Sequence, residues 1–359
     1  MRLAMLLAVP LAAAALGCAR GRSDAGPVRA PFDNTGYAHD RAGFEKVLAK
    51  AVALEGAVSA AGEGTAPFAA VIAPHDDHVY SARVALHAFS RLAARRVVLF
   101  GVAHHAKDHP EVEGKLVFDA FRAWHGPYGE VPVSPLREEL VAALGADSAI
   151  ASDPLHAGEH SLEGFVPFLQ ERVRDVEIVP ILVLYMSLAR LEELADRTGG
   201  ALAAAMKRRG WTLGKDVAIV ISSDGVHYGD EGWSGKRFDD FGTDGAGYDK
   251  AVARDHALIR DDLEGEVTPG KLSALYGALV KDDFHEYRVS WCGRFSVPFG
   301  LAALLAADRA LGAPPPRGAL LRYGTTLDPG AVDYGVPGLG PTAPANLHHW
   351  VSFFSMGFE

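Results

Sequence analysis

Three short apolar runs in this chain each end in side chains suited to chemistry. Residues 71–73 lead through Pro74 to His75, residues 97–100 lead to His104 and His105, and residues 217–221 lead to Ser222-Ser223-Asp224 and on to His227. Short runs rich in β-branched residues and bounded by Gly or Pro are typical of buried strands in a parallel sheet. Since ligands bind outside the carboxyl ends of such strands, these imidazoles and the carboxylate are predicted to converge on one crevice.

The remaining periodicity indicates an α/β fold. Strand-like runs occupy residues 68–73, 96–102, 177–185, 216–222, 317–325 and 351–358. Apolar residues at helical spacing predict helices over about 40–60, 81–94, 134–145, 161–174, 187–208, 246–261 and 296–311. This alternation predicts a single αβα sandwich with a mostly parallel central sheet. With 49% hydrophobic residues, the chain can bury a sizeable core.

The first residues read as an export signal. Arg2 is followed by an apolar stretch from Leu3 to Leu16 that is too short to span a bilayer, and then by Gly17-Cys18. Ala15-Leu16-Gly17-Cys18 resembles the bacterial lipoprotein signal, which predicts a signal peptide over 1–17 and lipidation of Cys18. An ordinary cleaved signal is the alternative. Residues 18–35 are then a tether, and residues 36–359 form the domain, exported and lipid-anchored at the bacterial cell envelope.

Charge and cysteine usage narrow the class of partner. A formal net charge of −10 argues against nucleic acid, which requires a basic footprint. The membrane is expected to be met only through the lipid anchor. Lipidation of Cys18 would leave the other cysteine of the sequence, Cys292, without a disulfide partner, so that thiol is expected to be either buried or used.

The candidate chemical groups are imidazoles, carboxylates and one thiol. His75, His104, His105 and His227 offer neutral imidazoles, the commonest transition-metal ligands. Asp224, Glu159 and His160 are suited to orient a ligating ring or add a donor. Cys292 lies just before a predicted helix and near Arg294, which favours its thiolate and predicts a metal ligand or a nucleophile. Two imidazoles and a thiolate suit iron or copper, with zinc as a third candidate.

Taken together, the motifs resemble the Memo family, also called the AmmeMemoRadiSam system protein B family. The matching segments, in family order, are Ala73-Pro74-His75, Gly101-Val102-Ala103-His104-His105, Glu159-His160-Ser161-Leu162-Glu163, Ser222-Ser223-Asp224 with His227-Tyr228-Gly229, and Cys292-Gly293-Arg294. The resemblance implies a fold similar to class III extradiol ring-cleaving dioxygenases. It implies metal binding by His75, His104 and Cys292. It also places Asp224, His227, Glu159 and His160 beside the metal as candidate catalytic residues.

The sequence also departs from the family pattern. Asp76-Asp77 stands where the family has Ala-Gly, and Phe165 stands where His or Gln is common. The family's early His-Ala-Gly-Ser-Trp-Tyr segment survives at best as Asn34-Thr35-Gly36-Tyr37. Pro74-His75-Asp76-Asp77 also resembles the zinc motif of amidoglycan deacetylases, with proline and histidine in the opposite order.

Three functions remain open at this point. The first is a metal-dependent redox enzyme, using iron or copper and acting on oxygen or a small-molecule substrate. The second is a non-catalytic metal carrier or binding module on the cell envelope. The third is a hydrolase, using either zinc-bound water or Cys292 as nucleophile.

Overall fold

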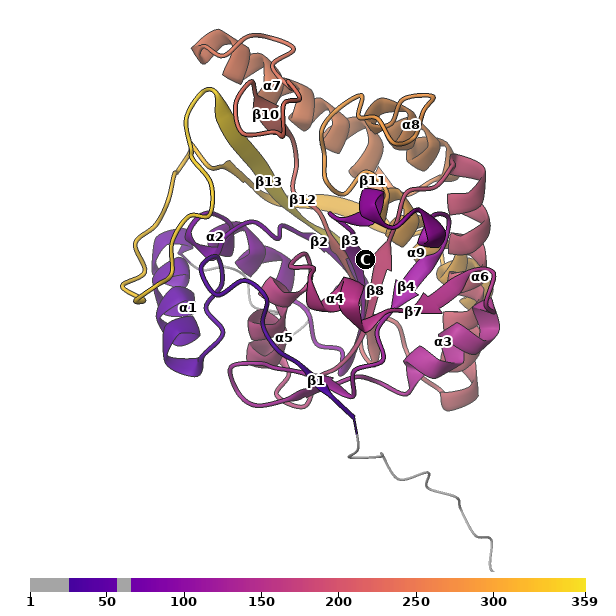
Figure 1. Ribbon diagram of the computed structural model, residues 1–359. Helices are drawn as coiled ribbons and strands as arrows, with labels where there is room; N and C mark the ends of the chain where they lie inside the picture. The colour runs from indigo at the N-terminus through magenta and orange to yellow at the C-terminus, as the bar shows by residue number, and fades with distance from the viewer. Residues whose placement is uncertain (1–25, 57–65) are drawn as a thin grey trace, which may run out of the picture.

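The computed structural model describes residues 26–56 and 66–359 of the chain (Figure 1). The predicted signal peptide, the lipidation site Cys18 and the first part of the predicted tether lie outside the described residues. Within the described residues, no helix combines the length and apolar character needed to cross a bilayer.

A large mixed sheet runs through the centre of the molecule. Ten strands contribute to it in the described part of the chain, and a separate small sheet has the order β1-β5-β6. The strands are β1 (Val28–Arg29), β2 (Ala70–Ala73), β3 (Arg96–Val102), β4 (Leu116–Phe118), β5 (Ala123–Trp124), β6 (Val131–Pro132), β7 (Ala149–Ala151), β8 (Glu177–Val183), β9 (Val217–Ser222), β10 (His227–Gly229), β11 (Gly265–Glu266), β12 (Arg317–Thr325) and β13 (His349–Phe358).

Only the centre of the large sheet is continuously parallel. Its order is β11-β12-β13-β2-β9-β3-β8-β4-β7, with β10 paired to β13. Strands β2, β9, β3 and β8 are parallel neighbours, whereas β13 is antiparallel to β2 and β4 is antiparallel to β8. The prediction of a central sheet with helices is confirmed. The sheet is mixed because antiparallel strands flank the parallel core on both sides.

The helices lie on both faces of this sheet. They are α1 (Arg41–Glu55), α2 (His78–Phe89), α3 (Leu136–Leu144), α4 (Asp153–Ala157), α5 (Val166–Arg172), α6 (Leu188–Arg209), α7 (Gly245–Leu258), α8 (Pro269–Leu279) and α9 (Ser296–Leu311). The helix predicted over 161–174 is confined to α5 and the short turn before it, and α8 was not predicted.

Alternation along the parallel strands builds two apolar layers. In β9, Ile219 and Ile221 pack in the layer that includes α6 and α9, whereas Ala218 and Val220 pack in the layer that includes α1 and α2. Both faces are therefore buried, as the continuous apolar runs predicted. Helices α6 and α9 lie so close that a Cβ on Gly199 would come within 2.2 Å of the Ala303 carbonyl oxygen. This rigid core holds the strand ends that carry the site.

Candidate metal centre

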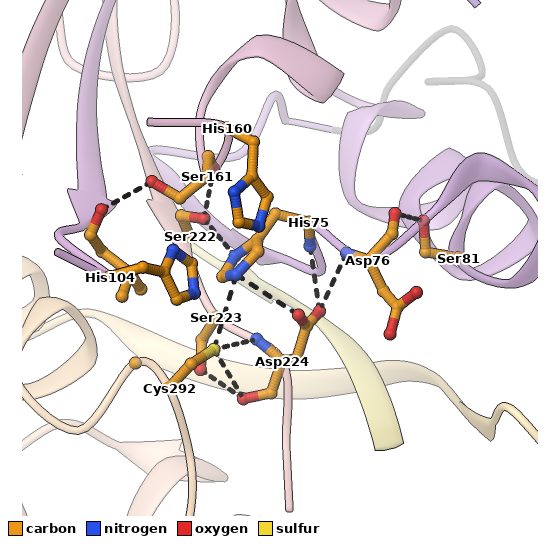
Figure 2. Close-up of polar contacts among 12 residues, drawn as sticks. His75, Asp76, Ser81, His104, His160, Ser161, Ser222, Ser223, Asp224 and Cys292 are labelled. Atoms are coloured by element: carbon orange, nitrogen blue, oxygen red, sulfur yellow. Dashed lines mark hydrogen bonds and ion pairs between the residues drawn. The ribbon is translucent and has the colours of Figure 1, made fainter. Parts of the chain in front are cut away.

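The candidate ligands meet at the carboxyl ends of the parallel strands. His75 follows β2, His104 follows β3 and Asp224 follows β9, while Cys292 comes from the turn before α9. Figure 2 shows these side chains facing one another. One ligand atom from each of His75, His104 and Cys292 lies within 4.8 Å of the others. The prediction that side chains at separate strand ends converge on one place is therefore confirmed.

His75 is buried and its ring orientation is fixed by a hydroxyl. Its Nδ1 lies 2.7 Å from Ser222 Oγ, and that hydroxyl donates its only hydrogen to the Ser161 carbonyl oxygen at 2.6 Å. Ser222 must then accept from His75, so Nδ1 carries the proton and Nε2 keeps its lone pair. Nε2 lies 3.6 Å from Cys292 Sγ. Burial lowers the pKa of His75 well below its usual value, which keeps the ring neutral.

His104 reaches the same tautomer through a carboxylate. Its Nδ1 donates to Glu159 Oε1 at 2.8 Å, and its backbone N–H donates to Glu159 Oε2 at 2.7 Å. Burial alone would lower the pKa of His104, but the charge and the hydrogen bond of Glu159, together with the charge of Asp224, outweigh burial and raise it. Burial likewise opposes ionisation of Glu159, yet His104 holds the pKa of that carboxyl well below its usual value. Both histidines thus direct Nε2 toward a common point, as ligands oriented by neighbouring groups do.

Cys292 is buried, with Sγ accepting a hydrogen bond from the Asp224 backbone N–H at 3.1 Å. Burial, reinforced by the Asp224 carboxylate, raises the pKa of Cys292 well above its usual value. The predicted thiolate is therefore wrong for the metal-free protein. The guanidinium of Arg294, which was expected to favour the thiolate, lies over the Tyr287 ring at 3.5 Å from its centre. A bound cation would reverse this preference, since a coordinating thiol is deprotonated.

Asp224 organises the His75 side of the cluster. Its Oδ1 accepts from the backbone N–H groups of His75 at 2.9 Å and Asp76 at 3.3 Å, and its Oδ2 lies 3.3 Å from His75 Nε2. Burial raises the pKa of Asp224 to about 7, above that of His75. Below neutral pH, the Asp224 carboxyl is therefore largely protonated while the His75 ring is neutral.

Two further predicted histidines border the cluster, and one does not. The His160 ring stacks on His104 at 4.5 Å, and Asp224, His227 and Cys292 also have donor atoms within 4.8 Å of one another. Burial lowers the pKa of both His160 and His227 to about 4. His105 is exposed and lies 3.7 Å from the Asp108 carboxylate, so it does not join the cluster.

Two cavities adjoin the cluster. One, of about 200 Å³, is lined by His75 and by the carboxylates of Asp33, Asp76, Asp77 and Asp224, with neither Lys nor Arg among its described lining residues. The other, of about 500 Å³, is lined by Cys292 and by aromatic side chains that include Tyr185, Phe238 and Tyr287. His104, His227 and Trp233 line both. A small molecule can thus reach the candidate ligands.

Some residues around the site were not predicted. Ser222 is the last residue of β9, so its position at the strand end was predicted, but its role in orienting His75 was not. Tyr37 ends the remnant of the family's early segment, but its place at the site, where its hydroxyl donates to the His75 carbonyl oxygen, was not predicted. Trp233 stacks on His349 with ring centres 3.9 Å apart, and it comes from the loop after β10.

The end of the predicted tether is also packed against the domain. Residues 28–29 form β1, parallel to β5, and Arg29 is only 2% exposed. This part of the chain was predicted to be a tether, but a buried ion pair between Arg29 and Glu163 fixes it to the domain.

An α/β protein with imidazole and thiol groups gathered at its strand ends is, in class, a candidate metalloprotein. The sequence profile of the Memo-like protein family matches residues 35–333. The chain therefore belongs to the Memo-like protein family.

Curated relatives agree with this assignment. A MEMO1 family protein of Methanothermobacter thermautotrophicus is 28% identical over 260 residues, covering 72% of this chain and 78% of the relative. One of Methanopyrus kandleri is 26% identical over 273 residues, covering 74% and 79%. One of Aquifex aeolicus is 33% identical over 162 residues, which is 44% of this chain and about half (54%) of that relative.

Proposed function

We propose that the protein binds one transition-metal ion through His75 Nε2, His104 Nε2 and Cys292 Sγ. The observation that carries the proposal is the pair of imidazoles whose Nδ1 protons are both committed elsewhere, which leaves two Nε2 lone pairs beside one sulfur. This set of donors is borderline to soft and suits iron or copper, with zinc as the third candidate. Its residues fit such an ion better than magnesium or calcium, which prefer oxygen.

We further propose that the site supports redox chemistry on oxygen or a small-molecule substrate, as in class III extradiol dioxygenases. A bound ion would supply Lewis-acid and electron-transfer chemistry at this position. His160 and His227, with pKa values of about 4, are neutral at physiological pH and can accept a proton from a substrate. Asp224 can hold a proton near neutrality, which suits proton return. The two adjoining cavities provide room for a ligand.

The alternatives differ in what they require. A non-catalytic metal carrier needs the same ligands but no access for substrate, and the cavities favour an enzyme. A zinc hydrolase would use the same donors without consuming oxygen. A cysteine hydrolase is disfavoured, because a buried thiol with a raised pKa is a weak nucleophile.

Metal analysis of purified protein tests the binding proposal. Wild-type protein is expected to retain about one equivalent of metal, whereas His75→Ala and Cys292→Ser lose it. His105→Ala is the matched control, since His105 directly follows the proposed ligand His104 in sequence but its side chain is exposed. Equal metal content in all four proteins would refute the site.

Turnover is a separate measurement. Anaerobically iron- or copper-loaded wild type is expected to consume oxygen with a small-molecule co-substrate, and His75→Ala is not. Tight, stoichiometric binding without oxygen consumption would favour the carrier. Activity lost with a chelator but retained after thiol alkylation, with no oxygen uptake, would favour the zinc hydrolase.

We also propose that lipidated Cys18 anchors the protein at the cell envelope. Metabolic labelling with a fatty acid is expected to mark the wild type and not Cys18→Ser. An unlabelled wild type would contradict the anchor and leave the metal proposal untouched.

A further inference from the structure

The segment just before the family match connects to the candidate metal centre. We call residues 28–37 the N-terminal belt. In Figure 1 this indigo segment leaves β1 and runs past α5 toward α2. It begins outside the residues matched by the family profile, which starts at residue 35. Arg29 lies in the part of the belt that precedes this match, whereas Tyr37 lies within it.

Arg29 anchors the belt to the loop that carries Glu159. Its Nε donates to the His156 carbonyl oxygen at 2.8 Å, and its Nη2 donates to the Glu159 carbonyl oxygen at 2.6 Å. Its Nη1 donates to Glu163 Oε2 at 2.6 Å. The guanidinium also lies 4.2 Å from the centre of the Trp124 ring. A single buried side chain thus holds both ends and the middle of residues 156–163.

Glu163 in turn binds the belt through hydrogen bonds to its side chains and backbone. It is as buried as Arg29, with side-chain exposures of 3% and 2%. Its carboxylate accepts from the backbone N–H groups of Phe32 at 2.9 Å and Asp33 at 2.6 Å. Removal of Arg29 would leave this carboxylate buried without its cation, an arrangement that is strongly unfavourable.

The loop held by Arg29 is the one that orients His104. The Glu159 carboxylate accepts from His104 Nδ1, from the His104 backbone N–H and from the Ser161 backbone N–H at 2.9 Å. A displaced Glu159 backbone would therefore move the group that directs His104 Nε2 toward the metal position. At its other end, the belt meets the first ligand loop, because Tyr37 donates to the His75 carbonyl oxygen.

We propose that Arg29 is a positioning residue of the metal centre: it fixes the Glu159 loop so that the Glu159 carboxylate holds His104 in its ligating orientation. The inference rests on the proposed function. Arg29 touches no ligand atom itself and acts through the carbonyl oxygen of Glu159 and the carboxylate of Glu163.

The test compares Arg29→Met with Arg83→Met in the full chain. Arg83 is also largely buried and pairs with Glu55 at the end of α1, so it controls for the general cost of breaking a buried ion pair. Anaerobic titration with Co²⁺ is expected to show about tenfold weaker binding for Arg29→Met, the lower range for groups behind a ligand. Arg83→Met is expected to bind Co²⁺ as the wild type does.

A second readout needs no metal. Amide hydrogen exchange of His104 and Ser161, whose N–H groups donate to Glu159, is expected to accelerate in Arg29→Met and to stay at the wild-type rate in Arg83→Met. Wild-type exchange and wild-type Co²⁺ affinity in Arg29→Met would overturn the positioning role. If His75→Ala and Cys292→Ser also bound Co²⁺ as the wild type does, the proposed function itself would fall, whatever the exchange data show.

Glu163→Gln guards against loss of folding in Arg29→Met. It keeps the side-chain shape and an acceptor for the belt, but weakens the bond to Arg29. The same direction of change in exchange and affinity is expected. A folded Glu163→Gln protein with unchanged values for both would also overturn the inference.

Discussion

The two strand ends that carry histidines orient their imidazole rings through different partners. At β2, a fully buried His75 is oriented by the neutral hydroxyl of Ser222, and its pKa falls. At β3, a partly exposed His104 is oriented by the carboxylate of Glu159, and its pKa rises. Both partners select the same tautomer. Only the carboxylate also adds negative charge, so the His104 side is expected to contribute more to binding a cation.

The largest effect is expected at the carboxylate. Glu159→Gln removes the charge but keeps the size of the side chain, and should weaken Co²⁺ affinity by about 10- to 100-fold. The measurement is a competition titration at fixed pH and salt. Glu55→Gln, which alters a carboxylate paired with Arg83 at the end of α1, is the control. An affinity within about threefold of wild type would show that the charge of Glu159 contributes little to binding the cation.

The substitution Asp224→Asn tests whether the carboxyl group beside His75 is protonated in the folded protein. Because the folded-state pKa of Asp224 is raised to about 7, the wild type has its full stability below the unfolded-state value near 4 and loses it as pH rises to about 7. The amide does not ionise, so at pH 8 the free energy of unfolding of metal-free Asp224→Asn should exceed that of wild type by on the order of 4 kcal/mol, since each unit of pKa corresponds to about 1.4 kcal/mol. The difference should be far smaller at pH 4.5.

Urea unfolding of both metal-free proteins at the two pH values gives this difference directly. A difference that is equal at pH 4.5 and pH 8 would show that Asp224 is ionised in the folded protein at both. The buried strand end would then carry a charge, as the His104 side does.

Ser222→Ala should have a smaller effect on metal affinity, up to about tenfold, since only the orientation of His75 is lost. It should also lower the free energy of unfolding by about 1–3 kcal/mol, because His75 Nδ1 and the Ser161 carbonyl oxygen lose their partner. Ser223→Ala, at the adjacent hydroxyl, is the control. A loss of affinity larger than that of Glu159→Gln would reverse the ranking of the two sides.

The smallest effect is expected at His105. This exposed ring follows His104 directly in sequence, yet it faces Asp108. His105→Ala should change both metal affinity and the free energy of unfolding by less than about 0.5 kcal/mol. A clear loss of metal would mean that the loop after β3 rearranges to use this ring as a ligand.

Much of the site could be predicted because the sequence shows where the buried strands end. The apolar runs before His75, His104 and Asp224 set both the strands and the edge at which they finish, so the convergence of these groups was predicted. Cys292, Glu159 and His160 were named from their residue types, and the family resemblance then placed them beside the metal; the structure brings all of them to the same edge.

What escaped prediction depends on long-range pairing or on burial. Arg29 and Glu163 lie 134 residues apart, and nothing in the local composition of either reveals the pair. The thiolate prediction for Cys292 weighed a helix terminus and a nearby arginine, but the cost of a buried charge was larger. The three-residue strands β4 and β7 are too short to leave a periodic signal.

The pairing of β13 determines how late in synthesis the large sheet can close. This strand, from His349 to Phe358, is the last in chain order, yet it pairs with both β12 and β2 inside the large sheet. During synthesis, β2 cannot pair with β13 until residues 349–358 have emerged from the ribosome. The large sheet can therefore close only after β13 has been made, later than every other described strand.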